Sequence, residues 1–302
     1  MENVFSLEDQ AKLAEEMQAI NWNDPTERYA VAETIVKEIS DEMEKNDLVR
    51  QFADIVRFKL GDTMQFATRK GAKAYVKAPG AAAPRSTIVQ KILTIDAEEV
   101  SVMLEFELDQ LKAGRYGGIS DVKNFAKEAL LTRKYKTLWD TMTGSVVNGT
   151  ANDFDATTSG VQKKFDKLND AIDHVEDQIG GVKAIVGRRT DLSFLLRFGQ
   201  SSDVQWSEKA KDRIIGGQAV PSFRGYPIIL LNNWKDDYNV DQITAGSIMV
   251  LSPGTVKLGV QRNVDALEGI NVEDRMWEIH MSELYGPAVF FPARNAKMRV
   301  TV

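Results

Sequence analysis

Residues 50–107 constrain this chain most, because they read as a long β-hairpin that has no core of its own. Around a tip of small residues at 78–84 lie short strand-like runs, at 55–58, 63–67, 73–76, 87–89 and 92–95. Proline and glycine punctuate the tip, which is typical of a loop. Because an isolated hairpin is at best marginally stable in water, we expect another subunit to support this one.

Charge is divided unevenly along the chain. In total there are 38 basic and 44 acidic residues, and this net charge of −6 is not typical of a nucleic-acid-binding protein. Residues 1–48 hold 13 acids and 4 bases, a net of −9, whereas residues 57–91 hold eight bases and one acid, a net of +7. These opposite charges favour contact between an acidic arm and a basic hairpin, because complementary charge steers association.

The acidic arm reads as two helices. The first begins after Ser6, and the second begins after Asp24, a good N-cap that is followed by Pro25 at the first helical position. One narrow apolar stripe follows the second helix, through Tyr29, Ala32, Val36, Ile39 and Met43. A helix with a single stripe must lie on something, either the core of its own chain or a partner.

Ser120 is expected to cap a helix that ends near residue 145 and is about 40 Å long. Its expected buried side consists of Val122, Phe125, Ala129, Leu138, Trp139 and Met142. Beyond it, buried strands at 184–187, 227–231 and 247–251 interleave with helices, and Asp191 is expected to cap a short helix. The end of the chain is rich in strands. This order predicts an α+β fold.

No catalytic, cofactor-binding or metal-binding site is expected. Without cysteine there is no disulfide, thiolate zinc site, iron–sulfur cluster or cysteine nucleophile. Phosphate-loop, dinucleotide-binding, zinc-protease and serine-hydrolase motifs are all absent. His174 could pair with Asp170 as a general base, but a surface histidine is the better interpretation. Residues 153–160 resemble a calcium loop only faintly, and we expect a solvated loop there.

No membrane partner is expected either. The N-terminus is acidic and lacks the layout of a signal peptide, and no run of apolar residues approaches the 18 that span a bilayer. The absence of cysteine fits a reducing cytoplasm.

The order of elements, together with local sequence, resembles the major capsid protein of tailed double-stranded-DNA bacteriophages, whose fold is shared with encapsulins. The local matches are residues 184–191 (AIVGRRTD), 223–228 (FRGYPI) and 275–292. The resemblance covers essentially the whole chain. It implies an N-terminal arm, an extended loop, a peripheral domain with a spine helix, and an axial domain. The corresponding residues are 1–48; 56–95; 96–150 and 254–285, with the spine helix at 120–145; and 151–253 and 286–302.

The resemblance implies a structural protein and not an enzyme. Copies of the chain would form pentamers and hexamers of an icosahedral shell around double-stranded DNA, which would be packaged without sequence specificity. Assembly in the host cytoplasm would lead to the virion, with a separate scaffold, portal and decoration protein as further partners. Two other classes stay open. One is an encapsulin-like compartment that holds protein cargo, and the other is a cytoplasmic α/β enzyme.

The hairpin and the arm are expected to meet between subunits. Burial there would come from Tyr29, Val36, Ile39, Phe58, Phe66 and Tyr75, and charge from Arg69, Lys70, Lys73 and Lys77. The same basic residues and aromatic rings could instead bind the phosphates and bases of nucleic acid. Protein–protein pairing is favoured, because the acidic arm supplies the opposite charge.

Overall fold

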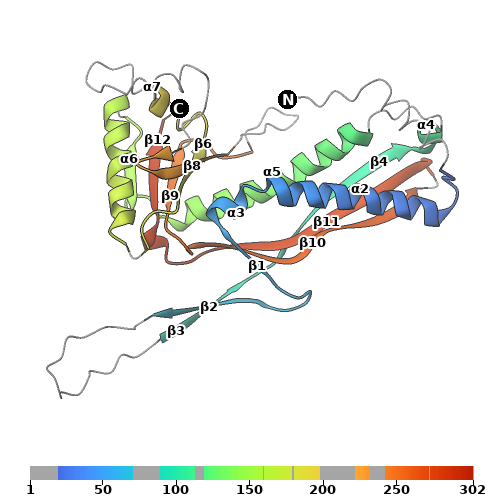
Figure 1. Ribbon diagram of the computed structural model, residues 1–302, viewed down its shortest axis with the longest axis horizontal. Coiled ribbons are helices and arrows are strands. Elements are labelled where there is room, and N and C mark those ends of the chain that lie inside the picture. The colour runs from blue at the N-terminus through green and yellow to red at the C-terminus, as the bar shows by residue number, and fades with distance from the viewer. Residues whose placement is uncertain are drawn as a thin grey trace.

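The structure is a computed structural model that describes residues 20–70, 89–112, 119–158, 160–178, 180–197, 222–231, 242–271 and 273–301. Two sheets and a projecting hairpin make up its architecture (Figure 1). The first sheet is long and carries two helices, α2 and α5, on one side. The second sheet stands at one end of the first and is covered by α6. The hairpin, β2 and β3, leaves the body near the junction of the two sheets.

The first sheet has the strand order β1-β10-β11-β4. Its strands are β1 (Asp54–Arg57), β4 (Glu98–Glu107), β10 (Val256–Asn271) and β11 (Met276–Val289). The pairs β10–β11 and β11–β4 are antiparallel, and β1 runs parallel to β10. Along β11, Trp277, Ile279 and Met281 alternate with Glu278 and His280 and are fully buried on the side of the helices.

Helix α2 (Pro25–Asn46) begins where the sequence predicts, because the side chain of Asp24 accepts a hydrogen bond from the backbone nitrogen of Thr26. Its stripe packs on the first sheet and on α5 through Ala32, Ile35, Val36, Ile39 and Met43. Tyr29, which was expected in the stripe, is 55% exposed. The short helix α3 (Val49–Phe52) follows. The predicted first helix, after Ser6, lies outside the described residues.

Helix α5 (Ile119–Ser145) is the predicted long helix. Leu138, Trp139 and Met142 are buried as expected, but Ala129 is exposed and Ala126 and Leu130 are buried in its place. The apolar side of this helix is therefore rotated in its first half relative to the prediction. A second short helix, α4 (Leu108–Lys112), lies between β4 and α5 along the chain.

The second sheet has the order β5-β12-β9-β6-β8-β7. Its strands are β5 (Asp153–Ala156), β6 (Ala184–Arg188), β7 (Ser222–Phe223), β8 (Tyr226–Leu231), β9 (Ser247–Leu251) and β12 (Ala296–Val300). The predicted strands at 184–187, 227–231 and 247–251 are confirmed. One face packs under α6 (Val161–Glu176), and the other joins the core beneath α5.

Asp191 does not have the expected capping role. Its side chain is buried and accepts a hydrogen bond from the backbone nitrogen of Gly246, at 3.2 Å, so it ties β6 to the start of β9. Helix α7 (Phe194–Arg197) follows. A 3-10 turn, η2 (Pro292–Arg294), leads from β11 into β12.

Candidate assembly surfaces

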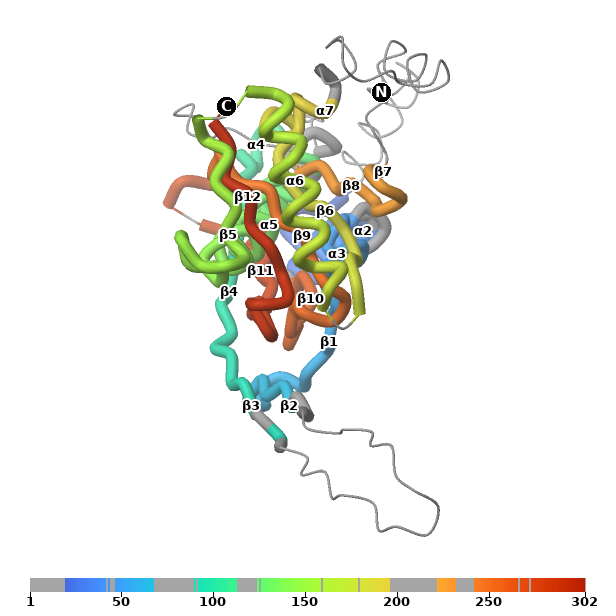
Figure 2. The backbone as a smooth tube through the Cα atoms, turned by 90° about the vertical axis from the view of Figure 1, so that its left-hand side faces the viewer, coloured from blue at the N-terminus to red at the C-terminus, as the bar shows by residue number. Residues whose placement is uncertain are grey.

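The hairpin projects from the body of the molecule (Figure 2). Strands β2 (Met64–Lys70) and β3 (Val89–Ile95) pair antiparallel, from Met64 opposite Ile95 to Lys70 opposite Val89. Figure 2 shows both strands outside the body of the molecule. This confirms a hairpin over 64–70 and 89–95, but the predicted hairpin of 50–107 is too long, because β1 and β4 pair in the first sheet. The expected contact residues Lys73, Tyr75 and Lys77 lie outside the described residues, and for Arg69 and Lys70 only the backbone is described.

The root of this hairpin packs on its own chain. The ring of Phe66 meets the rings of Phe58 and Phe290 edge-on, with centroids 5.1 and 5.5 Å apart, and the ammonium group of Lys257 lies over Phe66 and Phe290. Phe66 is only 5% exposed. The expectation that Phe66 gains its burial from another subunit is thus corrected, because Phe58, Phe290 and Lys257 of the same chain cover it, while Phe58 itself is only partly buried.

The arm needs the same correction. Val36 and Ile39 are 7% and 2% exposed, and both lie in the core between α2, α5 and the first sheet. Their burial comes from within the chain, so they present no surface to a second copy. Of the three contact residues expected on the arm, Tyr29 alone stays on the surface, beside the exposed acids Glu27 and Glu33.

The first sheet leaves most of its second face uncovered by described residues. Across β10, β11 and β4, the side chains of Leu267, His280 and Met103 form one row, because these residues are paired in register. Leu267 is 70% and Met103 53% exposed. Single exposed apolar residues are ordinary, and contiguous apolar patches mark contact surfaces, so this row with two exposed apolar side chains is a candidate contact surface.

Acidic side chains surround that row. Glu105 and Glu278 are paired on one side of it, and Glu99 lies on the other side. Hydrogen bonds from Ser282 and Arg262 hold the pKa of Glu99 below its ordinary value, so this carboxylate stays charged. We call this surface, made of Glu99, Met103, Glu105, Leu267, Glu278 and His280, the open face. Glu105 and Glu278 make it acidic on one side of the row, while Arg262 pairs with Glu99 on the other, and an acidic surface of this kind complements a basic partner.

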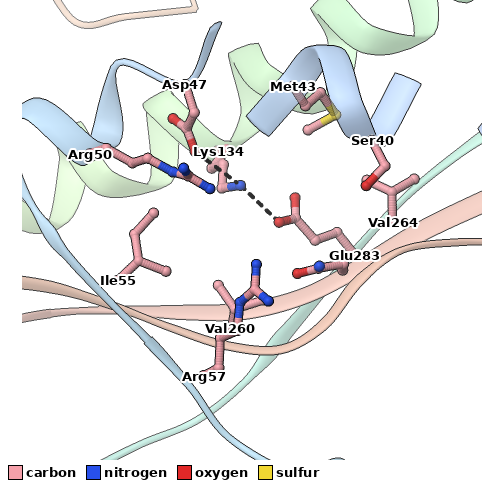
Figure 3. A pocket seen from close by; sticks show the side chains of 11 residues that line it. Ser40, Met43, Asp47, Arg50, Ile55, Arg57, Lys134, Val260, Val264 and Glu283 are labelled. Carbon is pink, nitrogen blue, oxygen red and sulfur yellow. Dashed lines mark hydrogen bonds and ion pairs between the residues drawn. The ribbon is translucent and has the colours of Figure 1, made fainter. Parts of the chain in front are cut away.

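A buried ionic cluster holds the other side of the sheet together (Figure 3). The ammonium nitrogen of Lys134, on α5, lies 2.8 Å from Glu283 Oε1 on β11 and 3.6 Å from Asp47 Oδ2 at the end of α2. All three side chains are 7% exposed or less. The sequence alone does not predict this cluster, because Glu283 lies 149 residues from Lys134 in the chain.

A cavity of about 40 Å³ adjoins the cluster and is lined in part by Arg50, Arg57 and Glu283. That volume is enough for one or two water molecules beside the charged groups. The hydroxyl of Tyr135 accepts a hydrogen bond from the backbone nitrogen of Leu48 next to it, and burial raises the pKa of Tyr135 to about 12. The hydroxyl is therefore neutral at physiological pH and acts through hydrogen bonding.

The residues considered for chemistry are engaged in structure. His174 Nε2 lies 3.2 Å from the carbonyl oxygen of Ala293, and Asp170 pairs with Lys167 instead of with His174. Arg299 pairs with Asp153 and Asp155, the acids of the faint calcium loop. In the described part of the chain, no three potential ligands gather into a group that could hold a metal ion. None of the described helices is long and apolar enough to cross a membrane.

No protein-family model matches this sequence, and no curated protein matches it. The chain does match solved structures. A protein of Microbacterium phage Oxtober96 is 15% identical with a TM-score of 0.59, over 84% of this chain and 90% of that one. The capsid structure of the cyanophage P-SCSP1u is 11% identical with a TM-score of 0.59, over 84% and 88% of the two chains. The chain has the tailed-phage capsid fold.

A particle from an archaeon has a similar fold. The virus-like particle from Pyrococcus furiosus is 14% identical with a TM-score of 0.54, over 88% of this chain and 96% of that one. The α+β capsid fold expected from the sequence is thereby confirmed. Three surfaces of this fold are candidates for contact between copies: the projecting hairpin, the open face, and the exposed side of α2 that carries Glu27, Tyr29 and Glu33. We call the last of these the outer side of α2.

Proposed function

We propose that this chain is the repeating subunit of an icosahedral shell that encloses the double-stranded DNA of a tailed phage. The observation that carries the proposal is the capsid fold with a basic hairpin that projects from the body while an acidic face of the sheet stays open. Such an arrangement offers a basic projection and an acidic surface, whose opposite charges favour contact between copies. Copies of the chain would be arranged as pentamers and hexamers, assembled in the host cytoplasm and carried in the virion.

In this proposal the first sheet with α5 is the peripheral domain, residues 96–150 and 254–285, and α5 is its spine helix. The second sheet is the axial domain, residues 151–253 and 286–302. Helix α2 belongs to the arm, residues 1–48, although it packs on the peripheral domain of its own chain. Residues 56–95 form the extended loop. A scaffold, a portal and a decoration protein would be separate partners.

The contact between copies would be made by the hairpin of one subunit and an acidic surface of another. Exposed ion pairs contribute about 0–1 kcal/mol each, so charge mainly steers the approach. Apolar burial would then come from exposed side chains such as Tyr29 on α2, Ile92 on the hairpin, and Met103 and Leu267 on the open face. The outer side of α2 and the open face are both candidates for this contact.

Sedimentation and negative-stain electron microscopy of the expressed protein test the function. Closed shells that package DNA in the presence of a phage packaging system are the expected result. A monomer or small oligomer under all assembly conditions would contradict the proposal. Shells that carry a protein cargo and need no DNA would favour the encapsulin-like compartment instead.

Charge reversal tests the contact. The variant with Arg69, Lys70 and Lys73 changed to glutamate should lose shells, because the hairpin would then repel an acidic partner surface. The matched control changes Lys163, Lys167 and Arg189 to glutamate, three exposed or half-exposed cations outside the hairpin. Shells at normal yield from the hairpin variant, or equal loss from both variants, would contradict a specific role of hairpin charge.

A further inference from the structure

Two glycines face each other in the middle of the first sheet. Gly259 on β10 is paired directly with Gly286 on β11. Neither has a positive φ, so backbone conformation does not require glycine at either position. Glycine inside a strand weakens the sheet and often marks a close approach by another part of the chain. Paired across two strands, these glycines leave a pit in the sheet surface, on the face opposite α2 and α5.

The side chain of Met64 fills this pit. Met64 is 1% exposed. A Cβ atom at Gly286 would lie 2.6 Å from Met64 Cε, 2.7 Å from the backbone oxygen of Asp96 and 2.9 Å from Ile95 Cγ2. A Cβ atom at Gly259 would lie 2.7 Å from Met64 Sδ. All these distances are shorter than the contacts that real Cβ atoms make, so a side chain at either position would force a neighbouring group to move.

The pit receives both strands of the hairpin at once. Met64 is the first residue of β2 and is paired with Ile95, the last residue of β3. The closing pair of the hairpin therefore rests on the glycine pair of the sheet. Beside it, the rings of Phe66 and Phe290 provide a second anchor under the ammonium group of Lys257. Two anchors on the body restrict the angle at which the hairpin leaves.

We propose that Gly259 and Gly286 are positioning residues for the hairpin: their pit fixes the direction in which the hairpin leaves the body. The second half of the inference rests on the proposed function. In a shell, that direction determines where the hairpin meets a second copy, and a changed direction alters the curvature or the closure of the shell.

The structure predicts a graded response to alanine. At Gly286 the added methyl group meets the backbone oxygen of Asp96, which cannot rotate away, and it must retreat from 2.7 Å to at least 3.4 Å for ordinary contact. At Gly259 the methyl group meets mainly the end of the Met64 side chain, which can adopt another rotamer. Gly269, also on β10, has nothing within 4 Å of a built Cβ and serves as the matched control.

Distance measurements between two spin labels test the first half. The chain has no cysteine, so Ile92→Cys on the hairpin and Leu267→Cys on the body, 54% and 70% exposed, accept labels without competing sites. Measured on dissociated subunits, Gly286→Ala should shift the mean distance by about an ångström or broaden its distribution. Gly259→Ala should have a smaller effect, and Gly269→Ala none. The same distribution in Gly286→Ala and Gly269→Ala would overturn the positioning role.

Met64→Ala keeps the test decisive if Gly286→Ala does not fold. This variant empties the pit without adding a clash, and the hairpin should then show a broader distance distribution. An unchanged distribution in a folded Met64→Ala subunit would also overturn the role. Circular dichroism establishes that the variant subunits are folded.

Electron microscopy of assembled particles tests the second half. If the wild type forms shells, Gly286→Ala should change their diameter or reduce their yield, while Gly269→Ala should match the wild type. Shells of unchanged diameter and yield from Gly286→Ala would overturn the role in assembly. If the wild type forms no shells, the proposed function fails, while the label distances still decide whether the glycine pit positions the hairpin.

Discussion

Replacing Lys134 by methionine should destabilise the subunit more than any exposed charge substitution. The ammonium group of Lys134 lies 2.8 Å from Glu283 Oε1 and 3.6 Å from Asp47 Oδ2, and the three side chains are 7% exposed or less. Removing one partner of a buried ion pair leaves an uncompensated charge and costs about 3–5 kcal/mol. Since Lys134 faces two carboxylates, its removal should fall at the upper end of that range.

The other members of the cluster should matter less. Glu283→Gln keeps a hydrogen-bond acceptor for Lys134 and leaves the ammonium group paired with Asp47, so a loss of about 1–3 kcal/mol is expected. The double variant Lys134→Met, Glu283→Leu removes both charges of the closer pair. Its loss of unfolding free energy should be smaller than the sum of the losses of the single variants Lys134→Met and Glu283→Leu. This non-additivity is the signature of a direct interaction.

Urea unfolding of dissociated subunits, followed by circular dichroism, measures these losses. With a slope of about 3 kcal/mol per molar urea, a loss of 3–5 kcal/mol lowers the midpoint by roughly 1–1.7 M. The matched control is Lys167→Met, since Lys167 and its partner Asp170 are 43% and 50% exposed. It should change the free energy of unfolding by about 0.5 kcal/mol or less. Equal midpoints for Lys134→Met and Lys167→Met would refute the reasoning.

Three further variants test other local features. Asp24→Ala removes the N-cap of α2 and should cost about 1 kcal/mol in urea unfolding, while Asp24→Asn should keep most of it. Lys297→Met should lower the midpoint of thermal unfolding. The buried ammonium group of Lys297 donates hydrogen bonds to the carbonyl oxygens of Thr143 and Val146 at the end of α5. Each hydrogen bond of a charged group contributes about 1.5–3 kcal/mol to stability. Burial raises the pKa of Asp191, so the folded state binds the proton of this carboxyl group more tightly than the unfolded state does. Proton binding to Asp191 therefore stabilises the fold at low pH, and this stabilisation is lost as the pH rises through the raised pKa. Asp191→Asn should therefore gain stability relative to the wild type as pH rises from about 4 to 7, which urea unfolding at several pH values will measure.

Features decided within a few residues were predictable. The start of α2 follows from Asp24 and Pro25, because both act on the first turn of the same helix. Alternation over residues 276–281 of β11 could be recognised in the sequence, because buried and partly exposed residues alternate there. The hairpin followed from short strand-like runs around a tip punctuated by proline and glycine. Each of these signals is local and needs no knowledge of what packs where.

Features set by distant parts of the chain were not predictable. Lys134 looked like a surface cation, and its partner Glu283 lies 149 residues further along. Gly259 and Gly286 carry meaning only once β10 and β11 are paired in their actual register. On α5, Ala129 was expected inside because it fits a helical spacing, but tertiary contacts choose Ala126 and Leu130. The spacing of apolar residues alone does not determine which side of a helix is buried when two adjacent sides both carry apolar residues.

The candidate site was partly predictable, because charge is a property of the sequence, while burial is a property of the fold. The contrast between an acidic arm and a basic hairpin stays valid as a basis for steering. Val36, Ile39 and Phe66 could not be assigned from the sequence, since an apolar stripe looks the same whether its own chain or a partner covers it. The structure assigns these three side chains to the interior of the subunit.

That assignment changes which acidic surface is the better partner for the hairpin. Helix α2 and the open face lie on opposite sides of the first sheet, so one hairpin does not cover both on the same neighbour. Burial of apolar area contributes about 25 cal/mol per Å², and charge discriminates poorly between two acidic surfaces. The open face offers Met103 and Leu267 in one row, whereas the outer side of α2 offers Tyr29. Because the open face exposes two large apolar side chains and the outer side of α2 exposes one, burial favours docking of the hairpin on the open face.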